Sequence, residues 1–450
     1  MKLTLVGGGG IRTPLFVRSL LRRVARGSRI DRLALTDIRP ERLAIMGRLT
    51  QRLITQSGLA LAVDVEPELD RALAGAGAVV TTIRPGFEIG RVQDELICRE
   101  AGILGQETVG AGGFAMAARS IPDLLHIAAR VRAVAPGARI LNFTNPSGIV
   151  TQALADQGFG EVIGICDSAD NVKEYIATQF GVAPARIRSR VFGLNHLSAT
   201  MQVWIDGEDV TAKLLADDAF VDRWFGIFGR ELVRELGAFP NEYLFYYLLP
   251  EKAVPAVLAE PETRGQKVVR LTDRFFARAN EPGALDDPDA LLAFHAACLA
   301  ERDATYMEYA WKETAAKQRP DHHLAEGEGY AGVALDVLEA AETGGGEIAL
   351  SVPNRGAIPW LAQHDVVEIT CRVDADGAHP LPPPVVPSRL EALVRQVKIF
   401  ETLTVLAVLH RSKQTAEWAL AAHPLVGRVD AAKKVLRRFM KAHAALGGLR

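Results

Sequence analysis

Short apolar runs alternate with amphipathic stretches along the first 195 residues. Five runs of strand length are rich in aliphatic and β-branched side chains, and helical patterns separate them. In the stretch at 11–26, Ile11, Leu15 and Leu20 fall near one helical face and arginines lie opposite. This alternation predicts a parallel sheet with right-handed crossovers. The expected strands are 2–6, 32–36, 78–82, 139–143 and 161–165.

The pattern changes after residue 195. The segment 191–210 predicts strand, turn and strand, and helical patterns then continue to about residue 340. Two further strand-like runs, at 347–356 and 365–373, precede three helical stretches. We therefore predict an α/β protein with a Rossmann-type domain at 1–195 and a mixed α+β domain at 196–450.

Composition and charge exclude several classes of protein. The chain has 450 residues, more than one average domain, and 48% hydrophobic residues with 24% charged residues are ordinary for a globular protein. A net charge of −2 creates no global field for nucleic acid or anionic lipid. No apolar run has the length of a membrane span, and the run before the first glycines is shorter than that of a signal peptide. The four cysteines show no disulfide spacing. We expect a cytoplasmic protein with reduced thiols and neither a nucleic-acid nor a membrane partner.

Polar and small residues follow every predicted strand. In a parallel sheet, ligands bind beyond the carboxyl ends of the strands, so these residues are the first candidates for a site. Loops are usually polar, and the shared location of these residues is what gives them weight. In chain order they are Gly7–Gly10, Asp37, Arg84-Pro85-Gly86, Asn142 to Asn145-Pro146, and Cys166-Asp167.

The turn GGGGIRTP joins the first strand to the first helix. Gly7, Gly8, Gly9 and Gly10 would let the backbone approach a pyrophosphate, although the strict G-x-G-x-x-G spacing is not met and a plain tight turn is the alternative. Asp37 ends the second strand, where a carboxylate accepts hydrogen bonds from a ribose diol. Together they predict NAD binding, with Arg84 as a further cofactor contact. Arg39 lies near Asp37 and could soften a preference for NAD over NADP.

Cys166 and His196 are candidates for a metal site. A thiolate and an imidazole on converging loops could hold a divalent ion and leave positions open for substrate oxygens. The alternatives are a buried cysteine that packs as a small apolar residue, and a core histidine with satisfied hydrogen bonds.

The order of several motifs resembles glycoside hydrolase family 4 over nearly the whole chain. Within that family the closest likeness is to the 6-phospho-β-glucosidases. The resemblance implies a two-domain fold of the lactate/malate dehydrogenase kind, with NAD and a divalent metal, usually manganese, as cofactors. It implies hydride transfer from sugar C3 to NAD, loss of the C2 proton, departure of the aglycone, addition of water and return of the hydride. The motifs that carry it are GGGGIRTP, TDI, IRPG, GQETVGAGGF, NFTNPSG, GIC, GLNHLS, NEYLFYYL, VPNRGAIPWL and LHRSKQTAEWALAAHPL.

The resemblance also assigns roles to single residues. Gln106 and Glu107 belong to its signature, without an assigned bond. Tyr246 and Tyr247 are expected to pack rather than react. The carried-over assignments are Cys166 and His196 as metal ligands, Tyr243 as the base at C2, and Asn145, Arg91 and Arg264 as contacts to the sugar and its 6-phosphate.

Asp167 departs from the family pattern. β-Acting members commonly have C-N-x-P after the metal cysteine, and α-acting members have C-D-x-P with the aspartate proposed as general acid. This chain has C-D-S-A. Asp167 could protonate the leaving oxygen, or only help to hold the metal or the sugar, so the anomer preference stays open.

The leading hypothesis is hydrolysis of a phosphorylated glycoside, a 6-phospho-β-glucoside, in carbohydrate metabolism. The alternative within the family is a 6-phospho-α-glucosidase or another family 4 glycosidase. An enzyme of a different class, an NAD-dependent 2-hydroxyacid dehydrogenase, would share the nucleotide domain but need no metal. A non-catalytic dinucleotide sensor would not need Cys166, His196 and Tyr243 together. The resemblance also suggests a homo-oligomer, a dimer or tetramer formed through the second domain.

Overall fold

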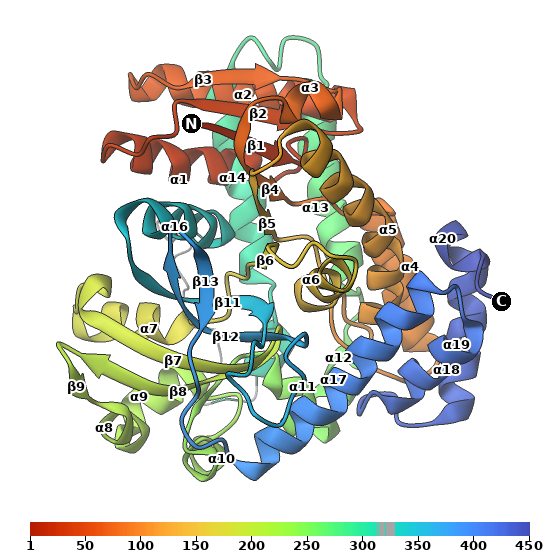
Figure 1. The fold of residues 1–450 in the computed structure, drawn as a ribbon. Coiled ribbons are helices and arrows are strands. Elements are labelled where there is room, and N and C mark those ends of the chain that lie inside the picture. Colours follow the sequence, from red (N-terminus) through yellow and green to blue (C-terminus); the bar gives the residue numbers. More distant parts are fainter. Residues whose placement is uncertain (313, 315–319, 321–328) are drawn as a thin grey trace.

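The computed structural model describes residues 1–312, 314, 320 and 329–450, and a nine-stranded sheet forms the centre of this part of the chain (Figure 1). Its strand order is β13-β12-β11-β6-β5-β4-β1-β2-β3, and β1 to β6 pair in parallel. The parallel part therefore has the order 3-2-1-4-5-6 of a Rossmann-type sheet. Its strands are β1 (Lys2–Val6), β2 (Arg32–Thr36), β3 (Ala62–Val65), β4 (Ala76–Thr81), β5 (Arg139–Asn142) and β6 (Ile163–Gly164).

The five predicted strands are confirmed, with the fifth reduced to Ile163–Gly164. The sequence did not predict β3. This four-residue edge strand is half exposed and contains Asp64, so it lacks the apolar run that marks the buried strands. The first helix, α1 (Thr13–Ala25), lies within the predicted stretch and packs against α2 (Pro40–Ser57) and α16 (Gly329–Thr343).

Three antiparallel strands from the C-terminal half extend the same sheet. β11 (Gly346–Pro353) pairs with β6 through Ser351 and Gly164, and β12 (Val366–Asp374) and β13 (Gly377–Pro380) follow. The two late strand predictions are thus confirmed, and the sheet they join is the N-terminal one. The main sheet therefore crosses the expected boundary at 195/196, and the division into two domains there stays a prediction.

A second sheet spans this boundary. β7 (Ile187–Leu194) and β8 (Leu197–Ile205) form a hairpin whose turn is Asn195-His196, and β9 (Glu208–Asp209) and β10 (Phe239–Pro240) pair with β8. The backbone N–H of Val191 donates to Thr370 Oγ1 at 2.8 Å, which fixes β7 against β12. The hairpin is thereby held against the part of the main sheet that the C-terminal half supplies.

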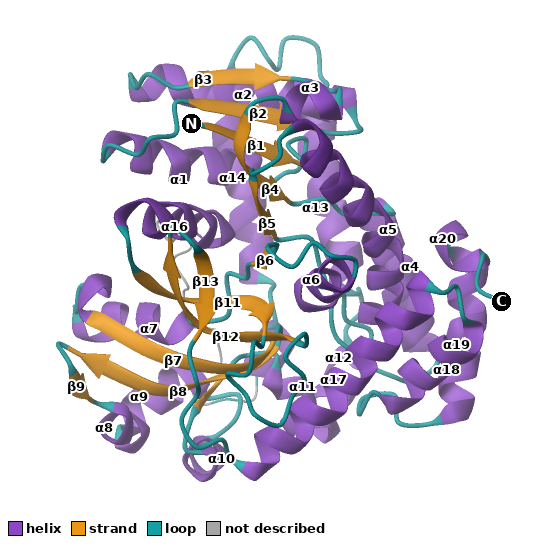
Figure 2. Ribbon diagram, viewed as in Figure 1, coloured by secondary structure: helices purple, strands orange, loops and turns teal. Residues whose placement is uncertain are grey.

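Helices surround both sheets (Figure 2). α5 (Gly110–Val134) packs against α3 (Leu69–Leu73) and α6 (Ser147–Asp156), whereas the long α17 (Ser388–Leu409) crosses α5 and α6 and contacts α18 (Lys413–Ala422). No helix in the described ranges is long and apolar enough to cross a membrane. The other helices are α4 (Phe87–Glu100), α7 (Asn171–Phe180), α8 (Thr211–Ala216), α9 (Asp218–Phe225), α10 (Arg230–Leu236), α11 (Leu244–Leu248), α12 (Pro250–Ala259), α13 (Arg264–Ala279), α14 (Pro288–Ala304), α15 (Glu308–Trp311), α19 (Val429–Ala442) and α20 (Ala444–Gly447), with a 3₁₀ turn at Pro184–Arg186.

Candidate active site

The glycine turn lies directly on the ends of the neighbouring strands. The N–H groups of Gly7 and Gly8 both donate to Thr36 O at 2.9 Å. Gly7 has φ +98°, and a Cβ there would lie 2.8 Å from Thr82 Oγ1. A Cβ on Gly9 would lie 2.9 Å from Asp37 Cγ, and one on Gly10 would lie 3.1 Å from Gly7 O. No side chain fits in this turn, which leaves the backbone as its surface.

Asp37 holds the glycine turn to β2. Its Oδ2 accepts from Gly9 N–H at 3.0 Å and its Oδ1 from Arg39 N–H at 2.9 Å. Burial raises the pKa of the Asp37 carboxyl, although both N–H groups oppose the shift. The Arg39 guanidinium stacks over Phe87 at 4.5 Å and pairs with Glu41 at 3.4 Å, so it is already occupied. The contact of the glycines and Asp37 with a dinucleotide stays a prediction.

Cys166 and His196 come together as the sequence predicts. Cys166 follows β6, and His196 occupies the β7–β8 turn with φ +62°. Cys166 Sγ and His196 Nε2 are 3.5 Å apart, and each residue is only 5% exposed. Ser168 Oγ lies 3.2 Å from the same sulfur. The hairpin is closely packed before this turn, where a Cβ on Gly193 would lie 2.2 Å from Leu197 O.

The spacing of these two atoms fits a shared metal ion. For zinc, metal–sulfur and metal–nitrogen bonds of about 2.3 Å and about 2.1 Å, at an angle of roughly 90–110°, separate two donors by about 3.1–3.6 Å. In the described ranges there is no group of three His, Cys, Asp or Glu side chains that could hold an ion. The pair would therefore leave coordination positions open to water or substrate oxygens, and a catalytic metal site needs at least one such position.

The protonation states of the pair depend on burial. Burial lowers the pKa of His196 to about 4, against the opposing charge of Asp167, so the imidazole is neutral near pH 7. Burial raises the pKa of the Cys166 thiol, and the charges of Glu368 and Asp167 raise it further. Without a cation the sulfur therefore keeps its proton. A bound cation would favour the thiolate, which is the form that ligates metals.

Tyr243 lies against the imidazole. The two rings stack with centroids 3.8 Å apart and an angle of 6° between their planes. Asn241 holds this segment in place, since its Oδ1 accepts from Tyr243 N–H at 3.0 Å and its Nδ2 donates to Ser168 O at 2.6 Å. Burial, followed by the charge of Glu242, raises the pKa of the Tyr243 phenol. The structure thus brings together three predicted residues from three separate segments.

Asp167 forms an ion pair with a residue of the glycine turn. Arg12 Nη2 donates to Asp167 Oδ2 at 2.9 Å. The same guanidinium lies 4.8 Å from the centre of the Tyr330 ring and 5.5 Å from that of Phe143. Arg12 therefore connects the expected cofactor end to the Cys166 loop. The sequence did not single it out, although it stands inside the motif GGGGIRTP.

Glu107 gathers two of the predicted arginines. Arg91 donates to Glu95 Oε1 at 2.7 Å and to Glu107 Oε2 at 2.6 Å, and Arg84 pairs with the other Glu107 oxygen. Burial, followed by the charge of Arg91, lowers the pKa of Arg84 to about 10. These bonds give the signature Glu107 a place, while the contacts of Arg84 with a cofactor and of Arg91 with a sugar stay predictions.

Arg264 lies beside a second arginine that the sequence did not reveal. Arg264 donates to Thr305 Oγ1 at 2.7 Å and to Arg302 O at 2.8 Å. Arg302 Nε is buried and has no hydrogen-bond partner within the described part of the chain. Burial and the positive charges of Arg12, Arg264 and Arg84 lower the pKa of Arg302 to about 9. Arg302 stands in α14, where no motif marks it.

The remaining asparagines differ in their surroundings. Asn142 is fully buried and bonded to Thr81 and Thr144, so it is structural. The backbone oxygen of Asn145 accepts from Ser120 Oγ at 2.8 Å. The contact of Asn145 with substrate stays a prediction.

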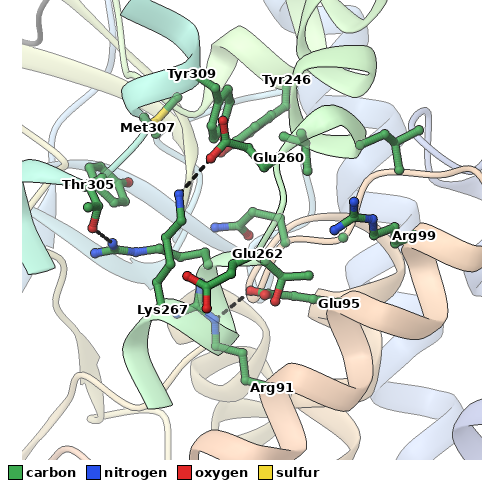
Figure 3. Close-up of a pocket in the computed structure, with 17 residues that line it drawn as sticks. Arg91, Glu95, Arg99, Tyr246, Glu260, Glu262, Lys267, Thr305, Met307 and Tyr309 are labelled. Carbon is green, nitrogen blue, oxygen red and sulfur yellow. Dashed lines mark hydrogen bonds and ion pairs between the residues drawn. The ribbon is translucent and has the colours of Figure 1, made fainter. Parts of the chain in front are cut away.

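A pocket opens beside Arg91 and Arg264 (Figure 3). It is lined by Arg91 and Glu95 of α4, by Lys267 of α13 and by Glu260, which follows α12. Figure 3 shows Arg91 directed toward Glu95, and Lys267 directed toward Glu260. Its lining also includes Gln106, Arg264 and Tyr306 but not Cys166, His196 or Tyr243. The pocket therefore takes in the predicted Arg91 and Arg264 but not the Cys–His pair.

Comparison with known proteins gives one consistent family. A family model described as "Family 4 glycosyl hydrolase" matches residues 2–182, and one described as its C-terminal domain matches 191–426. The chain is 30% identical to the 6-phospho-beta-glucosidase BglT of Thermotoga maritima over 98% of both chains. It is 26% identical to the phospho-alpha-glucosidase PagL of Clostridium acetobutylicum over 98% of this chain and 97% of that one.

Solved structures agree with these relatives. The Thermotoga maritima 6-phospho-beta glucosidase with manganese, NAD⁺ and glucose-6-phosphate superimposes with a TM-score of 0.82 at 28% identity, covering 98% of each chain. Malate dehydrogenase from Plasmodium falciparum has a TM-score of 0.51 at 12% identity, covering 91% of this chain and 99% of that one. The second likeness concerns the fold alone, and it confirms the predicted dehydrogenase-like fold class.

Proposed function

This chain belongs to family 4 of the glycosyl hydrolases, and on that premise we propose that it hydrolyses 6-phospho-β-glucosides with NAD and a divalent ion, Mn²⁺. The observation that carries the proposal is the cluster of Cys166, His196 and Tyr243 beside Asp167, whose partner Arg12 belongs to the glycine turn. A dehydrogenase of the 2-hydroxyacid kind would not need a thiol and an imidazole 3.5 Å apart. A non-catalytic sensor would need none of the three side chains.

A phosphorylated substrate is supported by the arginine pair at α13 and α14. Arg264 and Arg302 have no carboxylate among their hydrogen-bond partners in the described ranges, and Arg302 Nε lacks a partner there. Their mutual repulsion is one cause of the lowered pKa of Arg302. A phosphate dianion would offset this repulsion and accept charge-assisted hydrogen bonds. We infer that these two residues hold the 6-phosphate.

The cofactors supply a hydride acceptor and donor, and a Lewis acid, when bound. The glycine turn and Asp37 would hold NAD, while Cys166 and His196 would hold the metal. A thiolate is soft for manganese, so the oxygens of substrate and water would fill the other positions. Tyr243 would remove the C2 proton. Since burial raises the pKa of its phenol, it can act as a base only next to a positive charge.

Two observations support a preference for the β anomer: the higher sequence identity to 6-phospho-β-glucosidases, and the ion pair that Asp167 forms. The carboxylate accepts a hydrogen bond from Arg12 at 2.9 Å, so in this arrangement it serves as an ion-pair partner rather than a proton donor. The Cys-Asp dipeptide itself favours the alternative, a 6-phospho-α-glucosidase with Asp167 as general acid. Turnover of the two anomers distinguishes these candidates.

The test is an assay with chromogenic 6-phospho-β- and 6-phospho-α-glucosides in the presence of NAD, Mn²⁺ and a reductant. We expect turnover of the β anomer, loss on chelation, recovery with Mn²⁺, and no accumulation of NADH because the hydride returns to the sugar. Unphosphorylated glucosides serve as controls. Stoichiometric NADH formation, or turnover that chelation does not change, would contradict the proposal.

The proposal also covers the cellular location, the domain division and the oligomeric state of the protein. We place the chain in the cytoplasm, where its thiols stay reduced. We propose a division into a nucleotide domain at 1–195 and a substrate domain at 196–450, and a homo-oligomer formed through the second. Light scattering after size-exclusion chromatography measures the assembly, and a monomer at all concentrations would reject it.

A further inference from the structure

His196 has a hydrogen-bond partner on the side away from Cys166. Its Nδ1 lies 2.6 Å from Thr108 Oγ1, and Thr108 is buried two residues before α5 begins. This contact joins the β7–β8 turn to the GQET segment, 88 residues earlier in the chain. The imidazole therefore lies between Thr108 and the sulfur of Cys166, and the Tyr243 ring stacks on its face.

Gln106 fixes the direction of the Thr108 hydroxyl. The Gln106 side-chain oxygen accepts from the N–H groups of Thr108 at 2.6 Å and Val109 at 2.9 Å. These two donors settle which end of the amide is oxygen. Thr108 Oγ1 lies 2.9 Å from the same oxygen, so its hydrogen must point to Gln106. Were it to point to His196, two oxygen lone pairs would face each other at this distance.

A hydroxyl that donates to Gln106 can only accept from His196. The ring nitrogen Nδ1 must then carry the hydrogen, and Nε2, which faces Cys166, must carry the lone pair. A partner on the far nitrogen of a metal-binding histidine usually fixes both ring orientation and tautomer. We propose that Thr108, oriented by Gln106, is a positioning residue that sets the tautomer of His196 and thereby presents Nε2 to the metal ion.

This inference rests on the proposed function, because it assumes that Cys166 and His196 bind the ion. It gives Gln106 and Thr108 of the GQET segment a role at the metal site. Loss of such an outer partner typically weakens metal binding by about 10–100-fold. Thr108→Val keeps the shape of the side chain and removes the hydroxyl, whereas Thr108→Ser keeps the hydroxyl.

The experiment measures Mn²⁺ affinity directly, by the electron paramagnetic resonance signal of free Mn²⁺, on the full chain with NAD bound. Thr108→Val should weaken Mn²⁺ binding by about 10–100-fold with unchanged NAD affinity, and Thr108→Ser should restore it to within a few-fold of wild type. Thr404→Val is the matched control, since it also removes a buried hydroxyl, one that donates to Phe400 O at 2.8 Å within α17. It should bind Mn²⁺ as the wild type does.

Cys166→Ser separates the two levels of the argument. If this variant binds Mn²⁺ like the wild type, the metal assignment itself fails. If it loses Mn²⁺ while Thr108→Val binds normally, the metal site stands and the role of Thr108 is refuted. Equal losses in Thr108→Val and Thr108→Ser also refute it, because the hydroxyl would then be irrelevant. If Thr108→Val also lowers the affinity for NAD, Gln106→Leu takes its place. The same loss of Mn²⁺ affinity is expected of Gln106→Leu, and wild-type Mn²⁺ affinity in that variant would contradict the proposal.

Discussion

Replacing the buried Glu368 by glutamine is expected to make the stability of the protein less sensitive to rising pH. Glu368 lies on β12 and is 1% exposed. Its two carboxylate oxygens accept from Asn195 Nδ2 at 2.9 Å and from Ser198 Oγ at 2.8 Å, on either side of His196. Burial raises the pKa of Glu368 to about 7 from an ordinary 4.5 and outweighs the two hydrogen bonds, which lower it. The charge of Glu401 adds to the rise.

The sign of the effect follows from which state holds the proton. Between pH 4.5 and pH 7 the folded protein keeps a proton on Glu368 that the unfolded chain has released. Stability from this group is therefore complete below the lower value and falls as pH rises through the window. A shift of this size corresponds to roughly 3 kcal/mol in total, of which about 2.5 kcal/mol is lost between pH 5 and pH 8. Glutamine keeps the shape, does not titrate and should avoid this loss.

The assay is urea denaturation of the wild type and Glu368→Gln at pH 5 and pH 8, with Glu235→Gln, an exposed carboxylate of α10, as control. The free energy of unfolding should fall by about 2.5 kcal/mol more in the wild type than in Glu368→Gln, and Glu235→Gln should follow the wild type. An infrared band of a protonated carboxyl should disappear near pH 7 in the wild type and in Glu235→Gln, and this change should be missing in Glu368→Gln. Equal pH dependence in the two proteins, together with an unchanged infrared difference, would refute the reasoning.

Three further outcomes are expected. Gly9→Ala places a Cβ 2.9 Å from a carboxylate carbon and should weaken NAD binding at least about tenfold by calorimetry, whereas Gly160→Ala, with open space around it, should not; equal affinities would remove the turn from the NAD site. Asp167→Asn should lower kcat for a 6-phospho-β-glucoside by less than about tenfold, because the carboxylate pairs with Arg12; a fall of about 10²-fold or more would identify a general acid. Arg302→Gln should raise KM for the phosphorylated substrate by about 10–100-fold, the loss of one charge-assisted bond, with kcat little changed; an unchanged KM would place the phosphate elsewhere.

The fold was largely predictable because its central strands are buried on both faces. Lys2–Val6 and Arg32–Thr36 are nearly continuous apolar runs, whereas the half-exposed edge strand Ala62–Val65 carries no such signal. The joining of β11 to β6 rests on Gly164, where a Cβ would lie 2.7 Å from Ser351. That close approach links residues far apart in the chain, so no local pattern reveals it.

The same contrast holds for the candidate site. Cys166, His196 and Tyr243 could be selected because each stands in a recognisable motif, and the structure brings them together. The side chains that hold this cluster in place, or that add charge beside it, could not be selected from the sequence. Thr108 stands inside the motif GQETVGAGGF, but it acquires its partner His196 only in the fold, and Arg302 lies in an ordinary helix.

The central claim, that Cys166 and His196 share one metal ion, is tested most directly by counting the protons released when Mn²⁺ binds. The count comes from calorimetry near pH 7 in two buffers of different ionisation enthalpy. Burial keeps the thiol protonated and, with a pKa of about 4, His196 already neutral, so binding should release about one proton, all of it from Cys166. The Cys166→Ser variant should lose both the affinity and the release. Binding without proton release, or equal release from the serine variant, would contradict the account.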